Sequence, residues 1–543
     1  MSYLSCQRRI MYLLFILSVC FLWLVVRLFQ VQVLKSSALS QEAVQQRLQS
    51  TVLLDNRGNI QARDERSLLD GRLEIGLLAF PGQYRGREAE IISSLTSIQG
   101  IEQINTPPHG MLPFWITPAL NQKISPVFTS LPGLIPVSKM ERYGPGALAA
   151  HVVGYLRESE GRGVSGLELA FDRELSMGQR TVLAAVVDGH SRLIPGIGYR
   201  IRRAEFYSSN VVTTIDLDLQ RAVEQIMDRR IRQGAVVVLN PSNGDILAMA
   251  SRPGFNAASL TVHLQQDQDS LINRALWEYQ PGSIFKIVVA AAALEEDLVG
   301  LFDTFFCPGG VTVDGLYIPC SNLHHDQEIT LVEAFAHSCN TAFIRLALEL
   351  GPEKIYQYAR SLGFGEVTGL PIGERAGYLP AVAEMAGART QANTAIGQGP
   401  VQTTPLQVAA VMALIANGGR EIQPRLVLAL TDAYGREIRT FSPRRGQNVL
   451  SFSTVNKLKY LLQAVVAEGT GRPAGTTQAM LGAKTGTAQS GRLRDGREVL
   501  NHWIAGLYPL EKTRAAIVVF ADDLREGTVS DVFGAIASYL EQQ

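Results

Sequence analysis

The sequence has little cysteine and no excess charge of either sign. Five of its 543 residues are cysteine, and 50 Lys and Arg balance 50 Asp and Glu. A chain with this balance offers no general attraction for nucleic acid, although a local basic site is compatible with it. Its length predicts three or four domains, and its 46% hydrophobic content is enough for a large core.

Long apolar runs are scarce in this sequence, and one of them lies at the N-terminus. Ile10 to Val26 is a run of seventeen uncharged residues, and apolar character continues patchily to Leu34. This stretch can span a bilayer if Arg27 snorkels to the interface. A cleaved signal peptide is the alternative, but no A-x-A-like site follows, which favours an uncleaved anchor. Arg8 and Arg9 predict that the N-terminus is inside and that the chain after about residue 35 is outside.

The first chemical motif is Pro281-Gly282-Ser283-Ile284-Phe285-Lys286, followed by an apolar run over residues 287–294. Pro-Gly predicts a turn and the run predicts a buried helix, which places Ser283 in the first helical turn. Lys286, one turn later, shares its face and comes within hydrogen-bond reach. Apolar neighbours would lower the pKa of the lysine, so that its neutral amine could accept the serine proton.

Two further motifs follow in order. Ser338-Cys339-Asn340 starts 55 residues after Ser283 (338 minus 283), and Lys484-Thr485-Gly486-Thr487 starts 146 residues after Ser338 (484 minus 338). S-x-x-K with S-D-N and K-T-G is the known signature of β-lactamases and penicillin-binding proteins. The middle motif here reads S-C-N. In order and spacing, the chain resembles the class B penicillin-binding proteins, membrane-anchored D,D-transpeptidases that cross-link peptidoglycan.

The resemblance implies a role for each residue of the first two motifs. Ser283 would attack the D-Ala-D-Ala peptide bond and form an acyl-enzyme, with Lys286 as the base. Ser338 would relay a proton toward the leaving amine. Asn340, which has two donors and one acceptor, would hold Lys286 and bind the substrate amide.

The third motif is implied to bind substrate. Lys484 would add positive potential, and the hydroxyls of Thr485 and Thr487 would hold the terminal carboxylate. Gly486 lacks a Cβ and would let the strand approach the substrate backbone closely. The N–H groups of Ser283 and Thr487 would form the oxyanion hole. The alternative is that each motif is an ordinary helix cap, helix start or strand end.

The same resemblance implies peptidoglycan stem peptides and β-lactams as ligands, the cytoplasmic membrane as support, and no cofactor. A membrane glycosyltransferase of the division or elongation machinery is a further candidate partner, and nucleic acid is not expected. A D,D-carboxypeptidase or a β-lactamase-type hydrolase is the alternative. A non-catalytic division or sporulation scaffold or a penicillin sensor is another, although a sensor would need a cytoplasmic output segment and about nine residues precede the apolar run.

The expected fold is α+β and β-lactamase-like. We expect a tail over 1–9, a membrane anchor over 10–34, a mixed α/β pedestal domain over 35–207, and a transpeptidase domain over 208–543 with a central antiparallel sheet flanked by helices. Three stretches resemble parts of the family pedestal: Arg57-Gly58, Arg142 to Gly146, and Gly166 to Glu168.

Local patterns predict the elements of the last domain. The region over about 295–330 is predicted to be loop-like. The expected elements are a strand over 211–216, a helix over 217–229, a hairpin of strands 234–239 and 245–250, two strands over 502–507 and 514–521, and a closing helix over 528–540.

The cysteines predict a disulfide between Cys307 and Cys320. Cys6 is expected in the cytoplasm, Cys20 in the membrane span, and Cys339 in the helix of the S-C-N motif, which leaves this pair in a loop on the oxidising side. Two free thiols are the alternative.

Zinc is a weaker alternative for the same region. Cys320, His324, His325 and Asp326 cluster with Cys307 nearby, but their spacing fits no regular zinc pattern, so we predict no metal site. Elsewhere, His151 stands among apolar residues and is predicted to be a core histidine.

Overall fold

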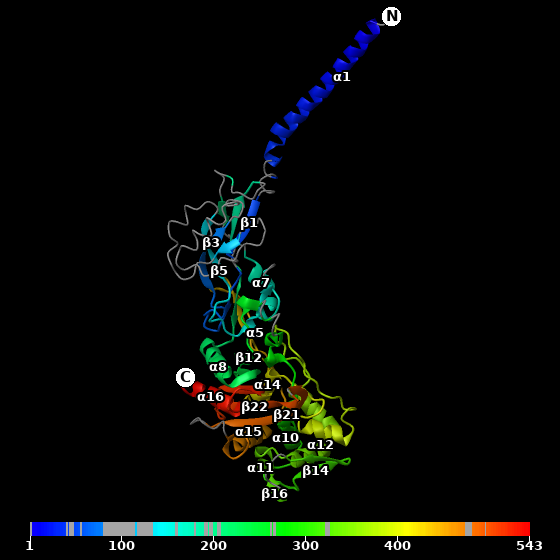
Figure 1. Cartoon of the computed structure of the whole chain (residues 1–543). Helices are drawn as coiled ribbons and strands as arrows, with labels where there is room; N and C mark the ends of the chain where they lie inside the picture. The colour runs from blue at the N-terminus through cyan, green and yellow to red at the C-terminus, as the bar shows by residue number, and fades with distance from the viewer. Residues whose placement is uncertain are drawn as a thin grey trace. The chain divides into compact units, whose positions relative to one another are not determined.

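The protein forms two compact units. The computed structural model describes residues 3–39, 42, 48–54, 57–79, 114–116, 134–157, 161–178, 181–188, 194, 199–202, 208–260, 263, 268–320, 326–472, 480–494 and 496–543 (Figure 1). The first unit is built from residues 1–56, 73–141 and 179–205, and the second from 57–72, 142–178 and 206–543. Two segments expected in the pedestal, 57–72 and 142–178, therefore belong to the same compact unit as the C-terminal part of the chain.

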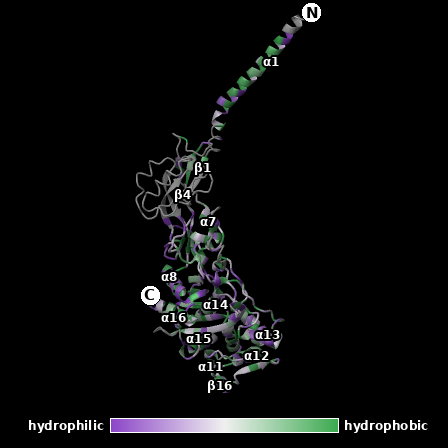
Figure 2. Ribbon diagram, in the orientation of Figure 1, coloured by the Kyte–Doolittle hydropathy of each residue, from purple (hydrophilic) through white to green (hydrophobic). Residues whose placement is uncertain are grey.

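The first unit begins with the apolar helix α1 (Tyr3–Phe29), which a π-helical turn extends over Gln30–Leu34. The stretch Arg8–Leu34 is long and apolar enough to cross a membrane, and Figure 2 shows hydrophobic residues along most of α1. Its strands form two sheets. β1 (Leu48–Leu54) pairs with β8 (Thr181–Val186), which also pairs with β9 (Tyr199–Arg202), and β3 (Arg72–Ala79) lies between β4 (Phe114–Ile116) and β5 (Leu134–Glu141).

Within the second unit, the three pedestal-like stretches meet at one buried carboxylate. Glu168, in the short helix α6 (Gly166–Ala170), is completely buried and accepts hydrogen bonds from Arg57 Nε (2.7 Å), Arg142 Nε (2.6 Å) and the Tyr143 hydroxyl (2.9 Å). A buried carboxylate needs such partners, because an unpaired charge is costly away from water. Segments more than a hundred residues apart are thus held together by a single side chain.

The centre of the second unit is a five-stranded antiparallel sheet with the order β12-β11-β23-β22-β21. The predicted hairpin is confirmed, with β11 at Ile231–Leu239 and β12 at Ile246–Arg252. The other strands are β21 (Gly482–Arg494), β22 (Arg497–Tyr508) and β23 (Ala515–Leu524). The strand β10 (Asn210–Thr213) belongs to another sheet and is followed by the predicted helix α8 (Leu217–Arg230).

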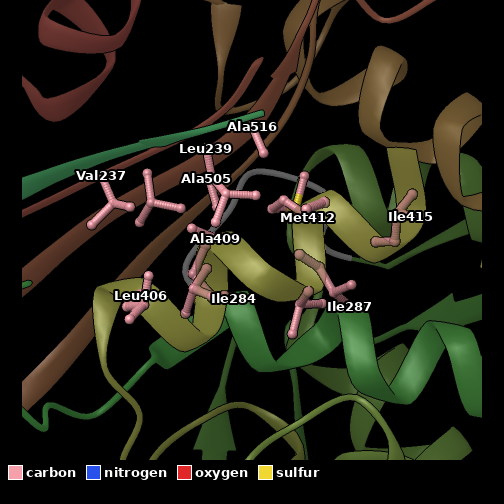
Figure 3. Packing of buried hydrophobic residues seen from close by; sticks show 14 of the residues in the cluster. Val237, Leu239, Ile284, Ile287, Leu406, Ala409, Met412, Ile415, Ala505 and Ala516 are labelled. Carbon is pink, nitrogen blue, oxygen red and sulfur yellow. The ribbon is translucent and has the colours of Figure 1, made fainter. Parts of the chain in front are cut away.

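Helices cover both faces of this sheet. Successive residues of a strand point to opposite faces, and β11 is buried at every position from Gly234 to Leu239, so both of its faces need cover. Val236 and Val238 share a core with α8 and with the closing helix α16 (Val529–Glu541). The alternate residues Val237 and Leu239 share the other core with α10 (Lys286–Glu295) and α14 (Pro405–Ala416), and Figure 3 shows both in one cluster with Ile284, Leu406, Ala409 and Met412. The expected α+β fold is therefore confirmed.

The prediction of loop over 295–330 was wrong, because four strands lie there. β13 (Thr304–Cys307) pairs with β16 (Gln327–Thr330), and β14 (Gly310–Val313) pairs with β15 (Leu316–Pro319). The β14–β15 turn is Asp314-Gly315, with positive φ at both residues, a hairpin signal that sequence analysis missed. The β13–β16 pair had no local signal in the sequence, because its two strands are separated by the β14–β15 hairpin and no short turn connects them.

Candidate active site

Ser283 lies in a tight turn at the start of the central helix. The turn η6 (Gly282–Phe285) is 3₁₀, and α10 follows from Lys286. Gly282 has a φ of 54°, and a Cβ there would lie 2.6 Å from the Thr487 carbonyl oxygen. The Gly282 N–H donates to the Gly397 carbonyl over 2.9 Å, so the 396–399 loop supports the turn. Ser283 is partly exposed at this turn while its neighbours are buried.

Lys286 is fully buried, and its amine reaches the S-C-N motif. Nζ donates to the carbonyl oxygen of Ser338 (2.7 Å), to Oδ1 of Asn340 (2.7 Å) and to Oγ of Ser338 (3.2 Å). Nζ also lies 5.7 Å from the ring centroid of Phe343. The structure thus brings Lys286, Ser338 and Asn340 together as the resemblance implied. Among the hydrogen bonds of the described residues none joins the side chains of Ser283 and Lys286, so that contact stays a prediction.

Burial lowers the pKa of Lys286 to about 8, although negative charge on Cys339 or Cys320 would raise it. Water solvates an ammonium better than this apolar site does, so the neutral form gains relative to the charged one. With a pKa of about 8, roughly one amine in ten is neutral at pH 7. Lys286 can therefore act as a base near neutral pH.

Ser338 connects the two buried lysines. It occupies a turn with a φ of 58° between α11 (Leu331–Ala336) and α12 (Asn340–Ser361). Lys484 Nζ donates to Ser338 Oγ over 3.1 Å, on the same oxygen that Lys286 approaches. Burial and the neighbouring Lys286 lower the pKa of Lys484 well below its ordinary value. Without a bound anion, a positive charge on one of the two amines therefore disfavours protonation of the other.

The K-T-G-T motif lies on β21, which is an edge strand of the central sheet. Thr487 is exposed, whereas Thr485 is half-buried and its hydroxyl is hydrogen bonded to that of Thr470. A Cβ on Gly486 would lie 2.8 Å from the carbonyl oxygen of Pro281. The glycine therefore lets β21 approach the turn that carries Ser283, a steric reason that differs from the predicted approach to substrate.

Sequence analysis missed two supporting residues, Thr470 and Gln280. Thr470 follows α15 (Phe452–Ala467), and its N–H donates to the Ala336 carbonyl over 3.1 Å. Gln280, just before the nucleophile turn, accepts at its carbonyl from Trp503 Nε1 (2.9 Å) and at Oε1 from Asn501 Nδ2 (3.1 Å). Only the Pro-Gly turn next to Gln280 is visible in the sequence. These contacts join segments that lie far apart along the chain.

The cysteines beside the motif form a group of three. Cys307 and Cys320 are free thiols with sulfur atoms 3.6 Å apart, so their disulfide stays a prediction. Cys339, predicted in the helix of the S-C-N motif, joins this pair, because its sulfur also lies 3.6 Å from that of Cys320. Cys339 is the N-cap residue of α12, and its side chain contacts Cys320, the residue that follows β15. Hydrogen bonds from Cys339 and Thr341 lower the pKa of Cys320.

Other residues singled out from the sequence are not part of this cluster. His151 is half-buried and its ring packs edge-on against Phe255, so the prediction of a core histidine is met only in part. Its Nε2 is 2.7 Å from the Ser270 carbonyl, and burial lowers its pKa to about 4. His324 and His325 of the zinc alternative lie outside the described residues, and Asp326 is exposed.

Taken together, the described side chains can perform acyl transfer. A serine at a helix start, a buried amine poised near neutral pH, and a hydroxyl shared by two amines supply a nucleophile, a base and a proton relay. The edge strand β21 beside them can pair with an extended peptide.

Comparison with known proteins agrees with this geometry. A family model for the penicillin binding protein transpeptidase domain matches residues 234–537. Stage V sporulation protein D of Bacillus subtilis is 33% identical over 409 residues, which cover 72% of this chain and 61% of that protein. The chain spans between about half and two thirds of the length of the first bacterial relatives it matches.

Two solved structures are similar over most of the chain. Penicillin binding protein 3 from Mycobacterium tuberculosis in complex with aztreonam is 25% identical, with a TM-score of 0.66 over 91% of this chain and 96% of that one. A chain of a peptidoglycan synthase complex is 26% identical, with a TM-score of 0.71 over 98% of this chain and 97% of that one. Because the Lys286 amine is hydrogen bonded to the S-C-N motif and the family model matches more than half of the chain, this chain belongs to the class B penicillin-binding proteins.

Proposed function

We propose that this protein is a membrane-anchored D,D-transpeptidase that cross-links peptidoglycan stem peptides through an acyl-enzyme on Ser283. The observation that carries the proposal is the placement of the Lys286 amine, 2.7 Å from both the Ser338 carbonyl and Asn340 Oδ1, one helical turn after Ser283. Those two hydrogen bonds use the two protons of a neutral amine, which leaves its lone pair for the third contact, the Ser338 hydroxyl at 3.2 Å. The lone pair takes the Ser283 proton only when the Ser338 hydroxyl does not donate to it.

In acylation, the Ser283 hydroxyl gives its proton to the neutral Lys286 amine as Oγ attacks the carbonyl carbon between the two D-Ala residues. The N–H groups of Ser283 and Thr487 stabilise the tetrahedral oxyanion. The C–N bond then breaks, and the leaving D-Ala amine takes a proton through Ser338, whose Oγ lies 3.2 Å from Lys286 Nζ. An ester between Ser283 and the donor peptide remains.

Lys484 makes this step sensitive to the substrate carboxylate. A carboxylate held by Thr485 and Thr487 would raise the pKa of Lys484, which burial and Lys286 keep low in its absence. A charged Lys484 would in turn favour the neutral form of Lys286, because the two amines share Ser338 Oγ. Binding of the substrate carboxylate would thus favour the neutral, basic form of Lys286 beside Ser283.

In deacylation, the amine of a second stem peptide attacks the ester and forms the cross-link. The exposed edge of β21 is the binding surface we assign to the donor peptide, since an edge strand has backbone groups that can pair with an extended chain. Hydrolysis by water in place of the amine would make the enzyme a carboxypeptidase.

We place the catalytic unit on the extracytoplasmic side. The apolar stretch Arg8–Leu34 would cross the cytoplasmic membrane once, with the N-terminal tail inside and the second unit, which carries the transpeptidase domain, outside. The similarity to a chain of a peptidoglycan synthase complex supports partners in the cell-wall machinery, and we propose a membrane glycosyltransferase among them.

The decisive experiment incubates the full-length protein in detergent with a stem pentapeptide and an acceptor amine. We expect cross-linked dimer and released D-Ala, and neither product with Ser283→Ala. Labelling of wild-type protein by a fluorescent penicillin, lost in a folded Ser283→Ala variant, checks the nucleophile. Free acid without dimer would identify a carboxypeptidase, and labelling without any turnover would identify a scaffold or sensor.

A further inference from the structure

Three buried cysteines that the proposed chemistry does not use converge beside the S-C-N motif. Cys307 ends β13, Cys320 directly follows β15, and Cys339 is the N-cap of α12. Their sulfur atoms all lie within 4.8 Å of one another, and all three side chains are buried. We propose that they bind one Zn²⁺ ion that ties these three segments together.

The distances fit the geometry of such a site. Zinc–sulfur bonds of about 2.3 Å at tetrahedral angles place sulfur atoms about 3.8 Å apart. The Cys320 sulfur lies 3.6 Å from the sulfurs of both Cys307 and Cys339. The third pair, Cys307 and Cys339, lies within 4.8 Å, so its sulfur atoms need to approach by at most about 1 Å.

A fourth position is occupied by a hydroxyl. Oγ1 of Thr341 lies 3.6 Å from the Cys307 sulfur and 3.5 Å from the Cys320 sulfur, and its side chain is completely buried. With a zinc–oxygen bond of about 2.0–2.2 Å, tetrahedral geometry predicts a sulfur–oxygen separation of about 3.5–3.7 Å. Thr341 thus completes the fourth corner, either by itself or through a bound water.

Backbone groups around the cluster suit a thiolate. The N–H groups of Asn340 and Thr341 both point at the Cys320 sulfur, at 3.2 and 3.4 Å. Such outer donors orient a metal ligand and stabilise its charge. Sulfur ligands select soft or borderline ions, and a divalent ion with three thiolates leaves one net negative charge where a monovalent ion would leave two. Because buried charge is costly, Zn²⁺ is the better occupant than Cu⁺.

Such a site would affect catalysis by holding the S-C-N turn in place. Cys339 stands between Ser338 and Asn340, the two residues that hold the Lys286 amine. An ion bonded to Cys339 would fix this turn against β13 and β15. The role is therefore structural support of the motif, and it does not depend on which acyl acceptor the enzyme uses.

The test uses full-length protein in detergent, without an oligohistidine tag, reduced with a phosphine and loaded separately with Zn²⁺ and Co²⁺. After desalting, we expect one metal ion per chain by elemental analysis and a thiolate-to-cobalt charge-transfer band. Cys307→Ser, which lies outside the S-C-N motif, should weaken Zn²⁺ binding by at least about 100-fold, beyond the loss expected for an outer partner. Cys20→Ser is the matched control and should bind normally.

A second measurement does not depend on variants. Zn²⁺ should raise the thermal midpoint of the reduced wild-type protein, and a chelator should reverse the shift. The proposal is overturned if no metal is retained after desalting while the three thiols remain free. It is equally overturned if protein from exporting cells carries a disulfide between any two of the three, shown by a mass two hydrogens lower and by a single alkylated thiol in the cluster.

Discussion

The Nζ atom of Lys286 lies 2.7 Å from the backbone carbonyl oxygen of Ser338. The base is therefore held by the main chain of the S-C-N turn as well as by side chains, and no side-chain substitution at position 338 removes that contact. Because this carbonyl cannot rotate away without moving the start of α12, the lysine is positioned before substrate arrives.

Lys286→Ala should reduce the rate of acylation by β-lactams by about 10²–10⁴-fold, because a general base is lost. In the wild type, the neutral amine is the active form. With a pKa lowered to about 8, the acylation rate should rise as the pH rises through that value and level off above it. Stopped-flow acylation from pH 6 to 10 measures both effects. A flat profile in the wild type would show that another group accepts the proton.

Gly486→Ala should impair acylation strongly, because the added Cβ would lie 2.8 Å from the Pro281 carbonyl oxygen and would push β21 from the nucleophile turn. Such misplacement costs on the order of 10²-fold in rate. Gly373→Ala is the control, since a Cβ there meets nothing within 4 Å. Fluorescent penicillin labelling rates compare the two, and equal rates would contradict the proposed steric role of Gly486.

Thr487→Val should weaken acylation by carboxylate-bearing β-lactams, because a charge-assisted hydrogen bond of about 1.5–3 kcal/mol is lost. Thr485→Val should do the same and should also break the contact with Thr470. Thr470→Val then separates loss of the carboxylate contact from loss of the Thr470–Thr485 contact, since it removes only the latter. The measurement is kcat/KM or its acylation equivalent for each variant. Unchanged acylation in both Thr485→Val and Thr487→Val would place the carboxylate elsewhere.

Glu168→Ala should destabilise the second unit by about 3–5 kcal/mol, because Arg57 and Arg142 would lose the buried carboxylate that they share. Urea unfolding followed by tryptophan fluorescence measures the change. Asp64→Ala removes an exposed partner of Arg66 and serves as the control, with little expected effect. Similar midpoints for both variants would show that the Glu168 network does not stabilise the unit.

The sequence by itself determined the chemistry and much of the local structure. The apolar run at the N-terminus, the turn before Ser283, the hairpin around Asn240 to Gly244 and the closing helix depend on patterns within a few residues. The three motifs predicted the reactive side chains because their residue types and order are specific. A local signal was also present in Asp314-Gly315, although it was read as loop.

Only the tertiary structure decided which distant side chains meet. Thr470 supports Thr485, Gln280 is held by Trp503, and Cys339 joins Cys307 and Cys320, yet none of these pairings has a sequence period that reveals it. The reason is physical: hydrogen bonds and ligand distances depend on how strands and helices pack, and packing is a property of the whole core. The apolar setting that lowers the pKa of Lys286 also arises only when α10 is buried against the sheet.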